Sequence, residues 1–95
     1  MAREPGTIFI GKKPTMSYVL AIITGLSISD AKNITLKARG RSIVTAVDVA
    51  EVTRNRFIKD LKLKNIVIGT EEIPPREGES RSRMVSTIEI TMAKE

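Results

Sequence analysis

Residues 33–41 read NITLKARGR, and this stretch decides how the chain is expected to fold. The apolar residues Ile34, Leu36 and Ala38 alternate with polar ones, which is the two-residue period of a strand that buries one face. A glycine and two arginines end the alternation. The stretch therefore predicts a half-buried strand over residues 33–38 that leads into a basic segment.

The segment after this strand has the pattern of an amphipathic helix over residues 42–57. Ser42 is the predicted N-cap, because a serine hydroxyl can accept a hydrogen bond from a free backbone N–H of the first turn. Asp48 lies on the polar side of this helix. The opposite, apolar side is expected to carry Ile43, Ala46, Val47, Ala50 and Phe57.

The segment before the strand predicts another strand, a tight turn and a second helix. Residues 7–10 form a β-branched and aromatic run that Gly11 closes. Pro14 is favoured at the first position of a helix, and apolar residues recur at helical spacing over residues 14–26. The side chains expected to face the core are Met16, Val19, Leu20, Ile23 and Leu26, with Tyr18 and Ile22 widening the apolar surface.

Two further strands are predicted over residues 63–72 and 84–92. Residues 73–83 between them hold prolines, a glycine, arginines and glutamates but little that can pack in a core. We interpret them as an exposed hairpin arm that reaches about 15 Å from the body, at ~3.3 Å per residue.

These elements predict an α+β fold of order βαβαββ. Two helices are expected to cover one face of a four-stranded mixed sheet in a two-layer arrangement. The length of 95 residues suits one domain, residues 1–95.

Composition restricts the function. The chain has no Cys and no His, so the commonest nucleophile, general base and transition-metal ligands are absent. We therefore expect no enzyme activity, metal or cofactor. The first six residues lack the apolar core of a signal peptide and no apolar run can span a bilayer, which predicts a cytoplasmic protein without a membrane partner. The net charge of +5 favours a polyanionic partner.

The turn over residues 11–14 is the first candidate site. Lys12 and Lys13 stand at the entry to a helix, whose free N–H groups and dipole attract anions, so phosphate is the expected ligand. The spacing of a P-loop is missing, which excludes nucleotide hydrolysis by that motif. A solvated turn that happens to carry lysines explains the same residues equally well.

The basic segment at the end of the predicted strand over residues 33–38 is the second candidate site. Lys37, Arg39 and Arg41 are two residues apart and would project from one side of an extended chain, where arginine forks can contact phosphate. An edge strand protected from aggregation by positive charge is the alternative. Clustering and net basicity favour the first interpretation.

The third candidate site is the arm with Arg76, Arg81 and Arg83, which could enter a groove of nucleic acid or follow its backbone. A plain solvated loop is an equally good interpretation of these residues, although long loops are often functional. Phe57 is either a core residue or an exposed anchor for self-association, and we favour the anchor. With three aromatic residues, the chain lacks the stacking platforms of single-strand binders. The mode of nucleic-acid binding that we therefore expect is salt-dependent contact with the phosphate backbone, with little dependence on base sequence.

A metal-dependent nuclease using Glu71, Glu72 or Asp48 is the enzymatic alternative. These carboxylates fit no metal-binding motif that we identify.

Five segments together resemble the Alba family of archaeal chromatin proteins, in order and over nearly the whole chain. They are IGKKPTMSYVL (10–20), ITLKARGR (34–41), AVD (46–48), RNRF (54–57) and VSTIEI (85–90). The resemblance implies a fold like the C-terminal domain of translation initiation factor three, a homodimer, and binding of DNA and RNA with little sequence preference.

The resemblance also implies roles for particular residues. Lys12 and Lys13 correspond to the lysine pair central to the binding surface, and Lys12 to the position that acetylating and deacetylating enzymes modify. Acetylation would remove a phosphate-pairing charge. Residues 37–41 and the arm correspond to further binding elements, and Phe57 to the aromatic residue at contacts between dimers. The arm sequence departs most from the family.

The expected function is that of an architectural protein that coats or compacts double-stranded DNA on the chromosome as a dimer. An RNA-binding subunit of a ribonucleoprotein assembly is the alternative.

Overall fold

The computed structural model describes residues 6–28 and 33–94. The first five residues, on which the expected lack of a signal peptide partly rests, lie outside the described part, as do residues 29–32 and 95. The elements in chain order are β1 (Thr7–Phe9), α1 (Thr15–Ile28), β2 (Asn33–Arg39), α2 (Ser42–Val52), the π-helical turn η1 (Thr53–Phe57), β3 (Leu61–Ile73) and β4 (Arg83–Lys94).

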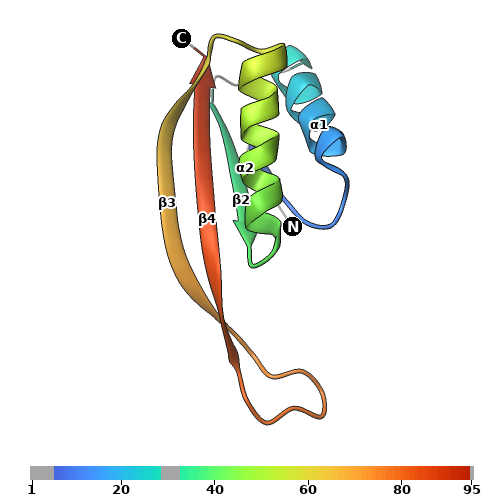
Figure 1. Ribbon diagram of the computed structural model, residues 1–95, viewed down its shortest axis with the longest axis vertical. Coiled ribbons are helices and arrows are strands. Elements are labelled where there is room, and N and C mark those ends of the chain that lie inside the picture. Colours follow the sequence, from blue (N-terminus) through green and yellow to red (C-terminus); the bar gives the residue numbers. More distant parts are fainter. Residues whose placement is uncertain (1–5, 29–32, 95) are drawn as a thin grey trace.

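The four strands form one mixed sheet in the order β1-β2-β4-β3 (Figure 1). Strand β1 is parallel to β2, because α1 carries the chain back before β2 begins, whereas β4 is antiparallel to both of its neighbours. The helices lie in a second layer on one face of this sheet. The predicted α+β class and the predicted two-layer arrangement are thus confirmed.

The core lies between the helices and the central strands. Alternate residues of β2 and β4 point toward the helices, and the helices supply the matching apolar side chains. Helix α2 packs on β2 and β4 but leaves most of the outer strand β3, beyond Leu61, exposed on this face. The largest side chains that are completely buried are Val19 and Ile22 of α1, Leu36 of β2, Val49 of α2, Leu61 of β3 and Met92 of β4.

The helical faces differ from the prediction at five residues, one of which is Phe57, 49% exposed. Met16 and Leu20 of α1 are 44% and 57% exposed, and in α2 Val47 is exposed while Val49 is buried. Both helices are apolar over much of their circumference, so packing against the sheet, and not the pattern alone, selects the inward side. The residues of α2 and η1 that are buried follow the spacing of one helical face: Ala46, Val49, Ala50 and Thr53.

The predicted cap of the second helix is wrong, whereas its predicted end at Phe57 is confirmed, although the last turn is π-helical. Arg41 occupies the N-cap position with no side-chain cap, and the Ser42 hydroxyl instead donates to the Gly11 carbonyl at 3.4 Å. The α-helix ends at Val52, after which the N–H of Ile58 donates to the carbonyl of Thr53 at 2.8 Å, a bond five residues long that widens the last turn.

Strands β3 and β4 form a long hairpin that projects well beyond the helices (Figure 1). Their pairing runs from Leu61 opposite Lys94 to Ile73 opposite Arg83, so it continues past the predicted strand ends. The loop over residues 74–82 is exposed throughout. The molecule is accordingly elongated, 47 × 27 × 23 Å.

Candidate nucleic-acid interface

The lysine turn between β1 and α1 is held in place by a tyrosine. The hydroxyl oxygen of Tyr18 accepts hydrogen bonds from the backbone N–H groups of Gly11, at 2.8 Å, and Lys13, at 3.1 Å. Tyr18 is only 7% exposed, so the turn is tied to a residue packed in the core. The Lys12 and Lys13 side chains are left exposed. In the sequence, the helical pattern indicates only an apolar role for Tyr18. The need of a buried tyrosine hydroxyl for a hydrogen-bond partner is the signal that points to this contact.

The turn between β2 and α2 lies beside the lysine turn. Gly40 has a φ of +58°, and a β-carbon there would lie 3.3 Å from Cγ1 of Val85, so a side chain would be both strained and crowded. The extended chain therefore ends at Arg39, and Arg41 already has helical backbone angles. The prediction that Lys37, Arg39 and Arg41 project from one side of a single extended segment is therefore wrong, because the chain turns at Gly40.

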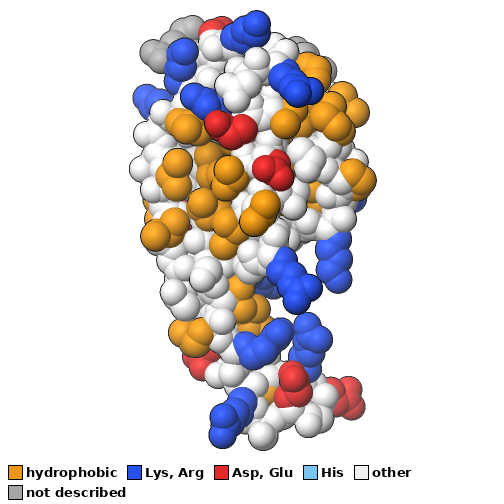
Figure 2. Space-filling model, viewed as in Figure 1, with side chains coloured by type: hydrophobic (Ala, Val, Ile, Leu, Met, Phe, Trp, Pro, Cys, Tyr) orange, Lys and Arg blue, Asp and Glu red, His pale blue; other side chains and the backbone are white. Residues whose placement is uncertain are grey.

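A groove of about 950 Å³ nevertheless gathers these cations. It lies where the two turns meet the base of the hairpin, and Figure 2 shows Lys and Arg side chains in the region where the hairpin leaves the body. Lys13 and Arg81 are exposed but do not line it. The predicted cations that do line it are Lys12, Lys37, Arg39, Arg41, Arg76 and Arg83.

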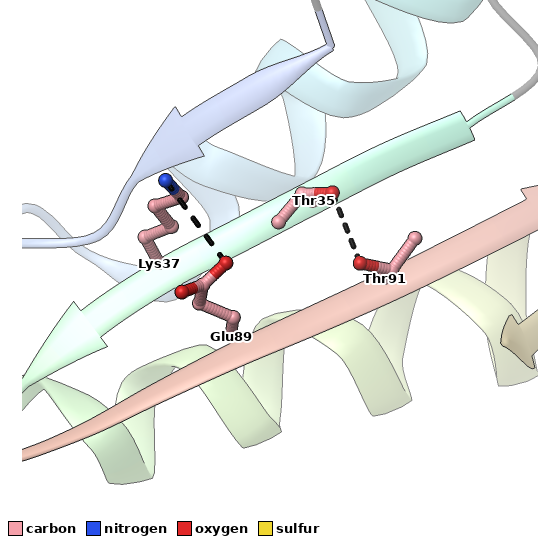
Figure 3. Close-up of polar contacts among 4 residues, drawn as sticks. All are labelled: Thr35, Lys37, Glu89 and Thr91. Atoms are coloured by element: carbon pink, nitrogen blue, oxygen red, sulfur yellow. Dashed lines mark hydrogen bonds and ion pairs between the residues drawn. The ribbon is translucent and has the colours of Figure 1, made fainter. Parts of the chain in front are cut away.

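Two carboxylates, whose place in this site the sequence does not predict, neutralise part of its positive charge. Nζ of Lys37 lies 4.0 Å from Oε1 of Glu89, and Nη1 of Arg39 lies 2.5 Å from Oε1 of Glu71. Figure 3 shows Lys37 and Glu89 projecting from the sheet face opposite the helices. Within the described part of the chain, the groove cations without an ion-pair partner are Lys12, Arg41, Arg76 and Arg83.

An apolar surface lies apart from this groove, over α2 and β3. Figure 2 shows hydrophobic side chains gathered in this region. Ile66 and Ile68 are register partners of the buried Ile90 and Ile88, so they lie on the helix-covered side of the sheet but beyond the reach of α2. The residues that define this apolar patch are Val44, Val47, Ile66 and Ile68. Phe57, in η1, is 49% exposed and is therefore no core residue.

The carboxylates of the nuclease alternative are dispersed. Glu71 pairs with Arg39, Glu72 accepts a hydrogen bond from the Ser82 hydroxyl at 2.6 Å, and Asp48 lies on α2. Among the described residues no three acidic side chains are grouped to hold a metal ion. Nor is any described helix long and apolar enough to cross a membrane.

The fold and the groove define a class: a small α+β protein whose basic groove lies between two strand-to-helix turns and a long hairpin. Residues 6–70 match the family model Alba. "DNA/RNA-binding protein Alba" of Thermoplasma acidophilum is 50% identical over 91 residues, which cover 96% of this chain and 98% of that protein. The protein of the same description from Picrophilus torridus is 47% identical over equal shares. The chain belongs to the Alba family, as the sequence resemblance predicted.

Solved structures agree. Alba from Thermoplasma volcanium superposes with a TM-score of 0.83 at 49% identity, over 93% of this chain and 99% of that one. ALBA1 from Trypanosoma brucei gives a TM-score of 0.75 at 21% identity, over 98% of this chain and 72% of that one, a likeness of fold.

Proposed function

We propose that this protein binds double-stranded DNA, and RNA, through phosphate contacts in the groove and without sequence preference. The observation that carries the proposal is the convergence of Lys12, Arg41, Arg76 and Arg83, which have no ion-pair partner among the described residues, on one concave surface. Relatives at 47% and 50% identity are described as DNA/RNA-binding proteins, which supports the same partner here.

Counterion release is the driving force that such a surface would use. Each Lys or Arg that neutralises a phosphate frees condensed cations from the polyanion, and this contribution does not depend on base sequence. The hairpin adds Arg76 and Arg83 from beyond the body, and it also carries Arg81 at a position outside the groove. Lys13 is exposed beside Lys12 and adds positive charge where nucleic acid would enter the groove.

We further infer a homodimer that coats or compacts DNA on the chromosome, in the cytoplasm, as an architectural protein. The support is the apolar patch over α2 and β3, since contiguous exposed apolar surface marks sites of association. Phe57 lies outside this patch and suits a contact between dimers, because exposed aromatic residues are favoured at interface centres.

Lys12 is the proposed site of acetylation. It lines the groove and is exposed, so modifying enzymes would have access to it when nucleic acid is absent. Acetylation removes the charge and with it a phosphate contact.

The alternative of an RNA-binding subunit uses the same groove. The observation that favours a contribution from RNA is the exposed ring of Phe9 on the groove wall. Titration of duplex DNA against cellular RNA at one salt concentration separates the two roles by their relative affinities.

The double variant Lys12→Ala/Lys13→Ala tests the proposed function. Loss of two cations per chain is expected to weaken duplex binding by about tenfold or more. The slope of the logarithm of the association constant against the logarithm of salt concentration is expected to become less negative by about 4 per dimer. The matched control is Lys59→Ala/Lys62→Ala, which removes the same charge from exposed positions that do not line the groove. Equal losses in both variants would show that only net charge matters and would contradict the assigned site.

A further inference from the structure

The ring of Phe9 lies on the face of the sheet opposite the helices. Ile8 and Ile10, its neighbours in sequence, pack in or against the core, so strand alternation turns Phe9 outward. Its exposed fraction is 63%. A single exposed phenylalanine is common on protein surfaces, so the inference depends on what surrounds it.

The surroundings of Phe9 are those of the phosphate-binding groove. Phe9 lines the same groove as Lys12 and Arg41. Lys37 lies opposite Phe9 in the pairing of β1 with β2, and its Nζ is 5.9 Å from the centre of the ring. An accessible aromatic ring and unpaired cations therefore share one concave surface.

We propose that Phe9 is a stacking site for an unpaired nucleobase of single-stranded nucleic acid whose phosphates lie in the groove beside Lys12 and Arg41. This inference rests on the proposed phosphate binding and adds a second mode to it. Single-strand binders combine a basic groove with aromatic rings on which bases stack. A base in a duplex is stacked and paired inside the helix, so it cannot reach Phe9. The proposal departs from the sequence-based expectation that the chain lacks a stacking platform.

Lys37 competes with a base for the ring but does not block it. A cation over an exposed ring is held more weakly than a stacked base. Lys37 is already paired with Glu89, 4.0 Å from its Nζ, so the cation keeps a partner when a base takes its place over the ring. Figure 3 shows both side chains on the open face of the sheet.

Two hydroxyls of this face, both outside the groove lining, are not available to select a base. The hydroxyls of Thr35 and Thr91 lie 3.0 Å apart and hydrogen bond with each other (Figure 3). They are thus already partnered, and the edge of a base would gain little by replacing that bond. We expect oligouridine and oligothymidine to bind alike, since both present a base plane and a phosphate chain.

A tryptophan at position 9 gives a direct readout, because the natural sequence contains none. In Phe9→Trp, the sole indole is expected to lose fluorescence when oligouridine or oligothymidine binds, through contact with a base. An abasic oligomer of the same length, which retains the phosphates, is expected to bind but to quench little. The control Leu20→Trp places the indole at a position of α1 that is 57% exposed and does not line the groove.

Affinity supplies the second readout. Phe9→Leu is expected to weaken binding of single-stranded oligomers by about 5- to 10-fold and to change duplex affinity by less than about twofold. The exposed ring contributes little to the core, so the variant is expected to fold, which thermal unfolding checks. The lysine double variant is expected to bind both single strands and duplex more weakly, which separates failure of this inference from failure of the proposed function.

Three outcomes would overturn the stacking site. The first is equal quenching by the abasic and the complete oligomer. The second is an equal effect of Phe9→Leu on single strands and duplex. The third is a fluorescence change of Phe9→Trp that depends on protein concentration alone, which would show that a second copy of the chain covers this face.

Discussion

Arg39 of β2 and Glu71 of β3 are joined across the intervening strand β4, with Nη1 of the arginine 2.5 Å from Oε1 of the carboxylate. Both residues line the basic groove. A carboxylate among cations lowers the local positive charge and occupies the guanidinium that a phosphate would otherwise contact. Glu71 is therefore expected to compete with the proposed ligand for Arg39.

Replacing Glu71 is expected to strengthen binding. Glu71→Gln frees Arg39, so duplex affinity should rise by about 2- to 5-fold near 0.1 M salt. The slope of the logarithm of the association constant against the logarithm of salt concentration should become more negative by about 2 per dimer. Both side chains are more than half exposed, so the pair adds little to folding stability. Fluorescence anisotropy with a labelled duplex at several salt concentrations measures both quantities.

Glu72→Gln is the matched control. Glu72 is the next residue of β3 and accepts from Ser82, but it does not line the groove. An increase in affinity as large in Glu72→Gln as in Glu71→Gln would mean that the specific pair has no role.

Tyr18→Phe is expected to loosen the lysine turn. The change removes the acceptor of the Gly11 and Lys13 N–H groups, which should destabilise the protein by about 1–3 kcal/mol. Duplex affinity should fall several-fold, because Lys12 and Lys13 lose their fixed position. Urea unfolding and gel-shift titration measure the two effects.

The control is Ser42→Ala, which removes only the long 3.4 Å contact to Gly11 and should change stability by less than about 0.5 kcal/mol. A larger loss of stability in Ser42→Ala than in Tyr18→Phe would contradict the role assigned to the Tyr18 hydroxyl in holding the turn.

The fold could be predicted from the sequence because each main element has its own period. The alternation at Ile34, Leu36 and Ala38 marks a strand with one buried face, and all three are buried. The inward sides of the helices could not be predicted as well, since Val47 and Val49 are equally apolar and the sheet decides between them.

The candidate site was only partly predictable. The sequence identifies the cations, and the structure brings Lys12, distant in sequence from Arg76 and Arg83, to the same groove. It does not identify Glu71 as the partner of Arg39, because that contact depends on strand order and register. Nor does it reveal that Phe9 shares the groove, since the role of one aromatic residue depends on which face of the sheet it occupies.

Ile68→Asp tests the proposed dimer. Ile68 is 78% exposed in the single chain, so a charge there should leave the fold intact but be costly in an apolar interface. Sedimentation equilibrium should show the dimer dissociation constant raised by at least about tenfold. Leu20→Asp, on α1 and away from the apolar patch, is expected to leave the mass unchanged. A dimer of unaltered affinity in Ile68→Asp would place the interface elsewhere.

Lys12→Gln imitates the charge loss of acetylation. Duplex affinity is expected to fall by about 3- to 10-fold, whereas Lys12→Arg, which keeps the charge, should bind nearly as well as the natural protein. Gel shifts at one salt concentration compare the three proteins. Equal binding by the glutamine and arginine variants would remove Lys12 from the proposed phosphate contacts.

The salt dependence of duplex binding bears most directly on the proposed function. If each chain of a dimer neutralises about four phosphates, the logarithm of the association constant should fall against the logarithm of salt concentration with a slope of about −7. The slope should be the same for duplexes of unrelated sequence. A slope near zero, or one that changes with base sequence, would contradict binding through the phosphate backbone.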